Sequence, residues 1–212
     1  MDPLPGELST IECFRLLDNI KLFGNPIVVL TGGDPLKRPD IVDIIAYGTR
    51  IGLTMTMTPS GTPRITREGI RQLKDAGLTR LAISLDGATG ERHDTFRGVG
   101  GFWEWTMDCI HYAREIELPV QINTTFAKYD VDDLRPLVAL MMDLEIALWS
   151  VFFMVPTGRG QADDTLSAQE NEDLFKQLYE LAKSAPFDIK TTAAPNIDDS
   201  SSKKRRKPAA PR

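Results

Sequence analysis

Short apolar segments alternate with amphipathic segments along most of the chain. The apolar segments predict β-strands, at residues 27–30, 53–57, 80–85, 120–125 and 149–155. The amphipathic segments predict helices, at about residues 10–23, 39–50, 66–77, 102–117, 130–148 and 167–184. This alternation, which begins with a helix, is typical of βα units on a parallel sheet. Residues 188–192 are a candidate for one more short extended segment.

Capping signals support several of these helices. Two capping boxes, which open helices, are formed by Ser9 with Glu12 and by Ser167 with Glu170. Asp130 is expected to cap the helix that follows the strand at 120–125. The segment 88–101 is polar and small, so we expect a loop there that includes His93. His93 and Asp94 have no further cluster of ligands to support a metal site.

The composition is that of one ordinary globular domain, with 212 residues, 42% hydrophobic and 26% charged. No apolar run approaches the roughly 20 residues that span a bilayer, and residues 1–10 lack the features of a signal peptide. We therefore expect a cytoplasmic protein with no membrane partner. Cys13 and Cys109 are too far apart for a local metal motif and are expected to be buried thiols.

Charge divides the chain into two regions. Residues 198–212 hold six basic and two acidic side chains, which leaves 19 basic and 28 acidic side chains in residues 1–197. An acidic body argues against a nucleic-acid-binding face. We expect a folded domain over residues 1–195 and a basic, low-complexity, disordered tail over 196–212. The run 203–207, KKRRK, is interpreted as solvated tail rather than as a localisation or nucleic-acid signal.

In parallel βα folds the ligand site lies at the carboxyl ends of the strands. We expect the 27–30 segment to be a buried parallel strand, and its end carries the sequence TGGDP. Gly32 and Gly33 let a ligand approach the main chain, and Asp34 adds a carboxylate that suits an ammonium group. Pro35 fixes the exit angle of this loop. The alternative is a tight turn in which Asp34 only caps the following residues.

The other strand ends carry small polar groups, and they are Ser60, Ser84, Asp86 and Asn123. Hydroxyl, carboxylate and amide groups of this kind bind ribose or other polyols, although each alone is more often a turn or capping residue. Arg97 lies in the segment beside the sequence SLDG, and it either pairs with a ligand carboxylate or is exposed to solvent.

Taken in order, these motifs resemble the S-adenosylmethionine (SAM) radical enzymes, in particular their haem-modifying and peptide-maturing (SPASM-type) branch. The matching pieces are TGGDP, ISLDG with HDTFRG, and FFMVPTGRG, and the resemblance runs from about residue 5 to 195. It implies a parallel (β/α)6 TIM-like barrel, incomplete here because the first strand is missing. It also implies SAM as cofactor, with a tetrapyrrole or a peptide as substrate.

The resemblance also implies contacts with the cofactor. Residues 32–35 would receive the methionyl amino group. Thr58 or Ser60, together with Ser84, would approach the ribose or the carboxylate. The backbone of Val155 and Pro156 would flank the adenine.

The chain departs from the family pattern at the cluster-binding loop. The motif CxxxCxxC, which holds a [4Fe-4S] cluster in the family, is expected before residue 1, and neither Cys13 nor Cys109 can replace it. We therefore expect a truncated, inactive form in which the strand at 27–30 is an unpaired apolar edge. One alternative is a non-catalytic SAM-binding or regulatory module. Another is a cluster-independent lyase, ranked last because none of the five strand ends carries a Lys or His.

Overall fold

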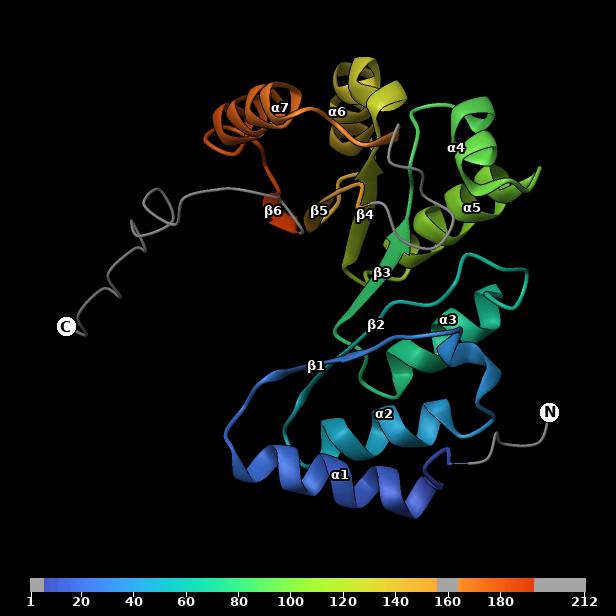
Figure 1. Ribbon diagram of the computed structural model, residues 1–212. Coiled ribbons are helices and arrows are strands. Elements are labelled where there is room, and N and C mark those ends of the chain that lie inside the picture. Colours follow the sequence, from blue (N-terminus) through green and yellow to red (C-terminus); the bar gives the residue numbers. More distant parts are fainter. Residues whose placement is uncertain (1–5, 156–163, 193–212) are drawn as a thin grey trace.

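A single parallel sheet organises the part of the chain that the computed structural model describes, residues 6–155 and 164–192. Its strands follow one another in sequence order, each hydrogen-bonded to the next, as Figure 1 shows. They are β1 (Ile27–Leu30), β2 (Thr54–Met57), β3 (Arg80–Ser84), β4 (Val120–Phe126), β5 (Leu148–Phe153) and β6 (Asp188–Thr192). The predicted incomplete TIM-like barrel is confirmed, and the candidate segment 188–192 is its sixth strand.

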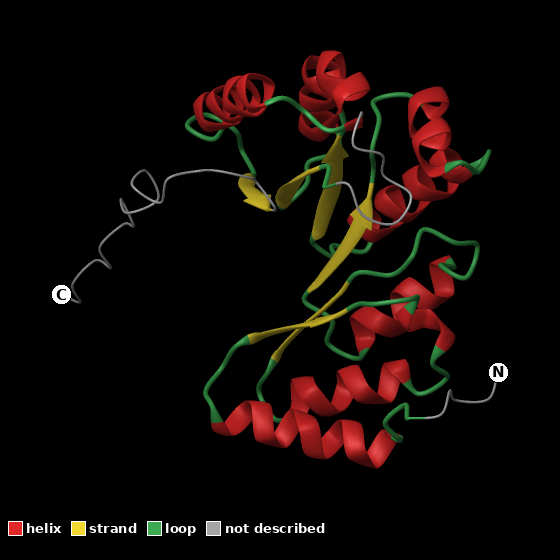
Figure 2. Cartoon of the chain, viewed as in Figure 1, coloured by secondary structure: helices red, strands yellow, loops and turns green. Residues whose placement is uncertain are grey.

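The helices form an outer arc around one face of this sheet and leave the other face uncovered by helices (Figure 2). They are α1 (Thr10–Leu22), α2 (Ile41–Arg50), α3 (Arg67–Asp75), α4 (Gly90–Arg97), α5 (Phe102–Glu115), α6 (Leu134–Asp143) and α7 (Ala168–Leu181). Two 3-10 segments, η1 (Pro35–Lys37) and η2 (Lys128–Asp133), follow β1 and β4. Both predicted capping boxes are present. Within residues 6–155 and 164–192 no helix has the length and apolarity needed to cross a membrane.

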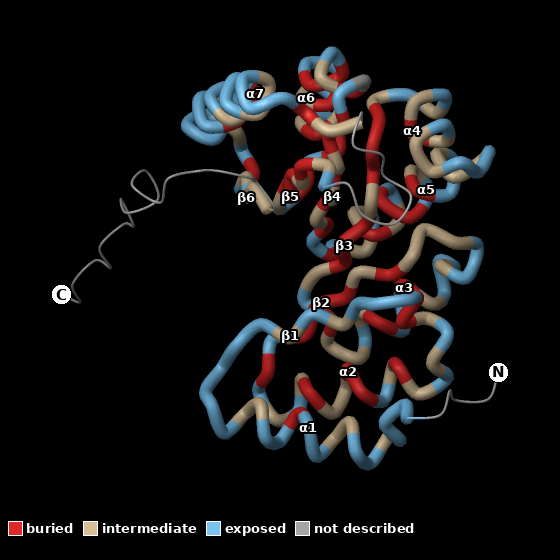
Figure 3. The backbone as a smooth tube through the Cα atoms, viewed as in Figure 1, coloured by how far each residue is buried: buried red, intermediate tan, exposed pale blue. Residues whose placement is uncertain are grey.

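Alternate residues of each strand point to opposite faces, and the two sets differ in chemistry. The helix-facing set forms the core, in which Met55, Leu81, Ile122 and Trp149 are all fully buried. The concave set is mostly polar, although Thr56, Ala82 and Ser150 in it are also buried. In Figure 3 the buried positions follow the strands and the inner sides of the helices, whereas the outer sides of α1 and α7 are exposed.

The strand β1 is less buried than the sequence predicted. Its register pairs it with β2 along one side only, and Ile27 and Val29 are 55% and 52% exposed. The prediction of a buried strand is therefore wrong, because burial on both faces and both edges requires neighbours that β1 lacks among the described residues. The expectation of an unpaired apolar edge is confirmed for that part of the chain.

Two local predictions around β3 and β4 are also wrong. The segment expected to be a loop contains α4, which opens on a Thr89 side-chain cap and ends at Gly98 in the left-handed conformation. Its residues are nearly all polar and only His93 is buried, so hydrophobic periodicity could not reveal it. Asp130 does not cap α6, because η2 intervenes and α6 begins at Leu134. The proposed tail, residues 196–212, and the boundary at 195 lie outside the described residues.

Candidate functional site

The loop after β1 exposes its main chain at the carboxyl edge of the sheet. Gly32 and Gly33 have φ angles of +89° and +39°, a conformation that residues with side chains rarely adopt. A Cβ built on either glycine meets no atom within 4 Å. The backbone beside these two residues therefore borders open space that a ligand can enter.

Side chains from the loop after β2 hold this glycine loop in place. Ser60 Oγ donates to the Gly33 carbonyl at 2.8 Å, and Thr62 Oγ1 donates to Asp34 Oδ2 at 3.2 Å. Asp34 Oδ1 accepts from the Leu36 amide, so this carboxylate caps η1 as the alternative interpretation proposed. The Thr58 amide donates to the Leu30 carbonyl at 2.9 Å. Pro35 is the first residue of η1 and is buried. The first two strand ends thus form one connected unit.

A second unit is built around Asp86 at the end of β3. Asp86 is 1% exposed, and its Oδ1 accepts from the Thr125 amide at 2.8 Å while its Oδ2 pairs with Arg97 at 2.5 Å. Burial raises the pKa of the Asp86 carboxyl, and the Arg97 guanidinium and the Thr125 amide oppose that rise. Both oxygens are occupied by protein groups. Asp86 therefore positions Arg97 and joins β3 to β4, and the partly exposed Arg97 remains at the edge of the site.

The helix α4 is fixed to the same edge by buried polar contacts. The Asp86 amide donates to His93 Nδ1 at 3.1 Å, and the Ala88 amide donates to Asp133 Oδ2 at 2.6 Å. Burial lowers the pKa of His93 to about 4, so the imidazole is neutral near pH 7. Asp130 is buried close by, and that burial raises its pKa to about 6. His93 therefore lies in a helix rather than in a loop, and it attaches that helix to the end of β3.

On the concave face, Ser84 and Asn123 are direct partners in the register of β3 and β4. The same row continues through Ser150 of β5 to Lys190 of β6. The sequence reasoning named the first two residues and missed the last two. Ser150 and Lys190 lie in mid-strand rather than at a strand end, and their concave position follows from the alternation of side chains along each strand.

The remaining predicted contacts fall at the end of β5. Val155 lies just beyond that strand and is 44% exposed, so its backbone borders the same edge of the sheet. Pro156 lies outside the described residues. The assignment of both to an adenine contact stays a prediction.

No metal centre is formed by the described side chains. Residues 6–155 and 164–192 contain no group of three or more His, Cys, Asp or Glu that could hold a metal ion. Cys13 lies on α1 and is partly exposed, whereas Cys109 is buried on α5, where burial raises its pKa to about 11. These 212 residues contain two cysteines, so they cannot supply the three thiolates of a [4Fe-4S] site.

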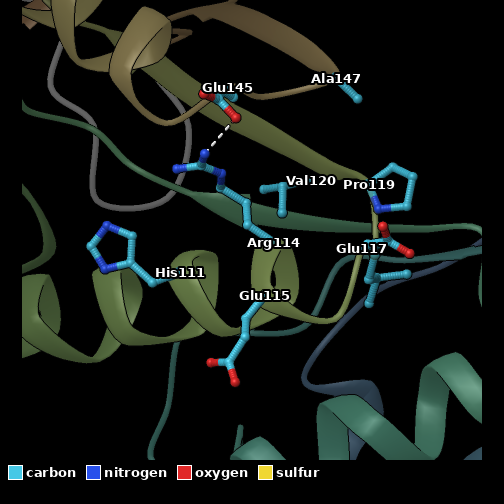
Figure 4. A pocket seen from close by; sticks show the side chains of 9 residues that line it. His111, Arg114, Glu115, Glu117, Pro119, Val120, Glu145 and Ala147 are labelled. Atoms are coloured by element: carbon cyan, nitrogen blue, oxygen red, sulfur yellow. Dashed lines mark hydrogen bonds and ion pairs between the residues drawn. The ribbon is translucent and has the colours of Figure 1, made fainter.

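A hollow at the opposite edge of the sheet does not form part of this site. It is lined by residues that lead into the amino ends of β4 and β5, among them His111, Arg114, Pro119 and Glu145 (Figure 4). Arg114 pairs with Glu145 across it at 2.5 Å. Ligands of parallel βα sheets bind at the carboxyl ends of strands. This hollow lacks the glycine loop and the polar row that mark that end.

Comparison with known proteins shows which family the chain resembles. Residues 1–141 match the sequence model of the Radical SAM superfamily. An AdoMet-dependent heme synthase from Methanosarcina barkeri is 39% identical over 191 residues, which cover 90% of this chain and 54% of that protein. A PqqA peptide cyclase from Rhodopseudomonas palustris is 30% identical over 140 residues, covering 66% and 37% of the two chains. The predicted resemblance to haem-modifying and peptide-maturing members is confirmed.

The fold is shared with solved structures as well. Streptococcus suis SuiB superposes with a TM-score of 0.72 at 17% identity, covering 89% of this chain and 44% of that one. The chain therefore spans about half the length of the curated relatives it matches, and less than half of SuiB.

Proposed function

Because the chain belongs to the Radical SAM superfamily, we propose that the carboxyl edge of its sheet binds S-adenosylmethionine as part of an enzyme acting on a haem precursor. The observation that carries this proposal is the open glycine loop after β1, where Gly32 and Gly33 leave main-chain groups accessible. S-adenosylmethionine is the cofactor of the family, and its methionyl ammonium group is matched by convergent carbonyl acceptors.

Different residues of the chain are proposed to contact different parts of the cofactor. Residues 32–35 offer carbonyl groups to the amino end, and Ser60 holds that loop through the Gly33 carbonyl. Ser84 and Asn123 offer a hydroxyl and an amide from the adjoining strands, suited to the ribose or the carboxylate. Arg97, oriented by Asp86, offers a cation to the carboxylate. The backbone of Val155 and Pro156 is proposed for the adenine.

When bound beside a [4Fe-4S] cluster, S-adenosylmethionine supplies a carbon radical to its enzyme. The two cysteines in these 212 residues do not fit that cluster, so the proposal for this chain concerns binding of the cofactor rather than its cleavage. This binding role is shared by the catalytic and the non-catalytic hypotheses.

The choice of a haem precursor rests on the relatives. Three AdoMet-dependent heme synthases are 38–39% identical to this chain, and an Fe-coproporphyrin III synthase from Methanosarcina barkeri is 33% identical over 180 residues. The PqqA peptide cyclases are 27–30% identical, and the mycofactocin maturases are 30% identical. We therefore propose a tetrapyrrole substrate ahead of a peptide.

Isothermal titration calorimetry with S-adenosylmethionine tests the binding proposal. Gly32→Ala adds a methyl group beside the exposed backbone, and we expect it to weaken binding by about tenfold, or roughly 1.4 kcal/mol. Gly6→Ala is the matched control, because Gly6 has a φ of +90° and its added Cβ likewise meets no atom within 4 Å. Both variants place an alanine at a positive φ angle, and they differ in whether that position lies in the glycine loop.

The expected result is measurable heat for the parent chain and for Gly6→Ala, and weaker binding for Gly32→Ala while circular dichroism shows it folded. Absence of heat from the parent at millimolar cofactor would overturn the proposal. Equal affinities of the two folded variants would overturn the assignment of the glycine loop.

A further inference from the structure

The concave face of the sheet carries an unusual row of polar side chains. Ser84, Asn123, Ser150 and Lys190 are successive register partners across β3, β4, β5 and β6. The interior of a closed βα barrel is normally filled by branched apolar residues. A continuous polar row therefore suits a ligand better than it suits packing.

Three charged side chains of this face have no partner among the residues that the structure describes. Lys190 is exposed and makes no side-chain hydrogen bond or ion pair with any described residue. Asp188 lies two residues earlier on the same face, yet the two groups form no ion pair. Arg80, at the start of β3, likewise has no side-chain partner in the described ranges, and its Nε is buried without a hydrogen bond.

From this arrangement we propose that Lys190 and Arg80 anchor carboxylate groups of the substrate on the concave face. The inference rests on the proposed function and adds the residues that select the substrate. Ammonium and guanidinium groups are donors without acceptors, and carboxylates are their strongest common partners.

The spacing of the two cations indicates the size of the ligand. Arg80 precedes Ser84 by four residues on β3, which is about 13 Å along a strand. Lys190 lies in the same row as Ser84 but three strands away, which adds about 14 Å across the sheet before curvature. A small monocarboxylate cannot reach both cations. A macrocycle with carboxylates on several sides can, which favours a tetrapyrrole acid.

The test uses coproporphyrin III, a porphyrin bearing several carboxylates, and its fully methylated ester as the uncharged counterpart. Binding to the 212-residue chain is followed by porphyrin fluorescence. We expect the acid to bind more tightly than the ester, and Lys190→Met to weaken binding of the acid by about tenfold, as for loss of one charge-assisted hydrogen bond. Arg80→Met should have a similar effect.

Lys176→Met is the control for loss of one positive charge, because Lys176 lies exposed on the outer helix α7. We expect it to leave coproporphyrin binding unchanged. Equal binding of acid and ester by the parent, or equal loss in Lys176→Met and Lys190→Met, would overturn the anchoring of carboxylates at Lys190.

Calorimetry with S-adenosylmethionine separates this inference from the function on which it rests. Lys190→Met should retain the cofactor affinity of the parent, and an equal loss for cofactor and porphyrin would overturn the assignment of Lys190 to the substrate. A parent chain that binds S-adenosylmethionine but not coproporphyrin III would overturn this inference and leave the proposed function standing. A chain that binds neither would overturn both.

Discussion

The two faces of the sheet are built from neighbouring residues of the same strands and carry opposite chemistry. On β4, Val120, Ile122 and Phe126 pack against the helices with at most 2% exposure, whereas Gln121 and Asn123 lie half-buried on the concave face. Stability should therefore depend on one face and binding on the other. Substitutions one residue apart can separate the two properties.

A buried polar side chain on the helix-facing side of β4 is satisfied by its neighbours. Thr124 of β4 is 1% exposed, and its Oγ1 donates to the Leu85 carbonyl at 2.7 Å while accepting from Trp149 Nε1 at 2.9 Å. The concave side differs, because Arg80 and Lys190 remain without partners among the described residues. Unsatisfied polar groups are costly when buried, so the Arg80 Nε, which is buried without a hydrogen bond among the described residues, indicates a surface meant for a ligand.

The largest expected effect comes from Ile122→Ala compared with Asn123→Ala. Ile122 is fully buried in the core, so its truncation should lower the free energy of unfolding by about 2–4 kcal/mol through lost burial and a cavity. Asn123→Ala should cost less than about 1 kcal/mol, since it removes one partly exposed hydrogen bond from Gln121. Urea unfolding measures both. Similar losses for the two variants would contradict the division between the faces.

Much of this division could be predicted from the sequence. The apolar runs gave the strands and the capping boxes gave two helix starts, because both signals are local. The site followed in part, since Gly32 and Ser84 stand at strand ends where parallel sheets bind ligands. The helix α4 could not be found by periodicity because its buried face is a single His93. Lys190 was missed because the register that aligns it with Ser84 links residues more than a hundred positions apart.

A second, smaller effect concerns Asp130, a buried carboxyl that lies outside the concave face. Burial raises its pKa to about 6 from an ordinary value of 3.8, so the folded state holds its proton more tightly than the unfolded state does. The stabilisation from that proton is full at low pH and is lost as pH rises from about 4 to above 6. Near pH 7 the ionised, buried group then destabilises the fold.

Asp130→Asn removes this penalty. Relative to the parent, its free energy of unfolding should rise between pH 4 and pH 7 by roughly 1–2 kcal/mol. Asp132→Asn, at an exposed position on the same 3-10 segment, controls for the loss of one negative charge. Urea unfolding at several pH values follows both variants. If the free energies of unfolding of the parent and of Asp130→Asn changed with pH in parallel, the ionised Asp130 carboxyl would not destabilise the fold.

The smallest expected effect lies at the amino edge of the sheet, away from the glycine loop after β1. Glu117 follows α5 with a φ of +55°, a left-handed conformation that glycine adopts without strain, as Gly77 does after α3 with a φ of +96°. Glu117→Gly should raise the free energy of unfolding by about 0.5–1 kcal/mol, because relief of strain exceeds the added entropy of the unfolded chain.

Glu117→Ala keeps the strain and controls for the lost carboxylate. Chemical denaturation should show a higher free energy of unfolding for Glu117→Gly but not for Glu117→Ala. Both variants should bind S-adenosylmethionine like the parent. A change in cofactor affinity would mean that the amino edge and the concave face are coupled, contrary to the separation that the two faces of β4 suggest.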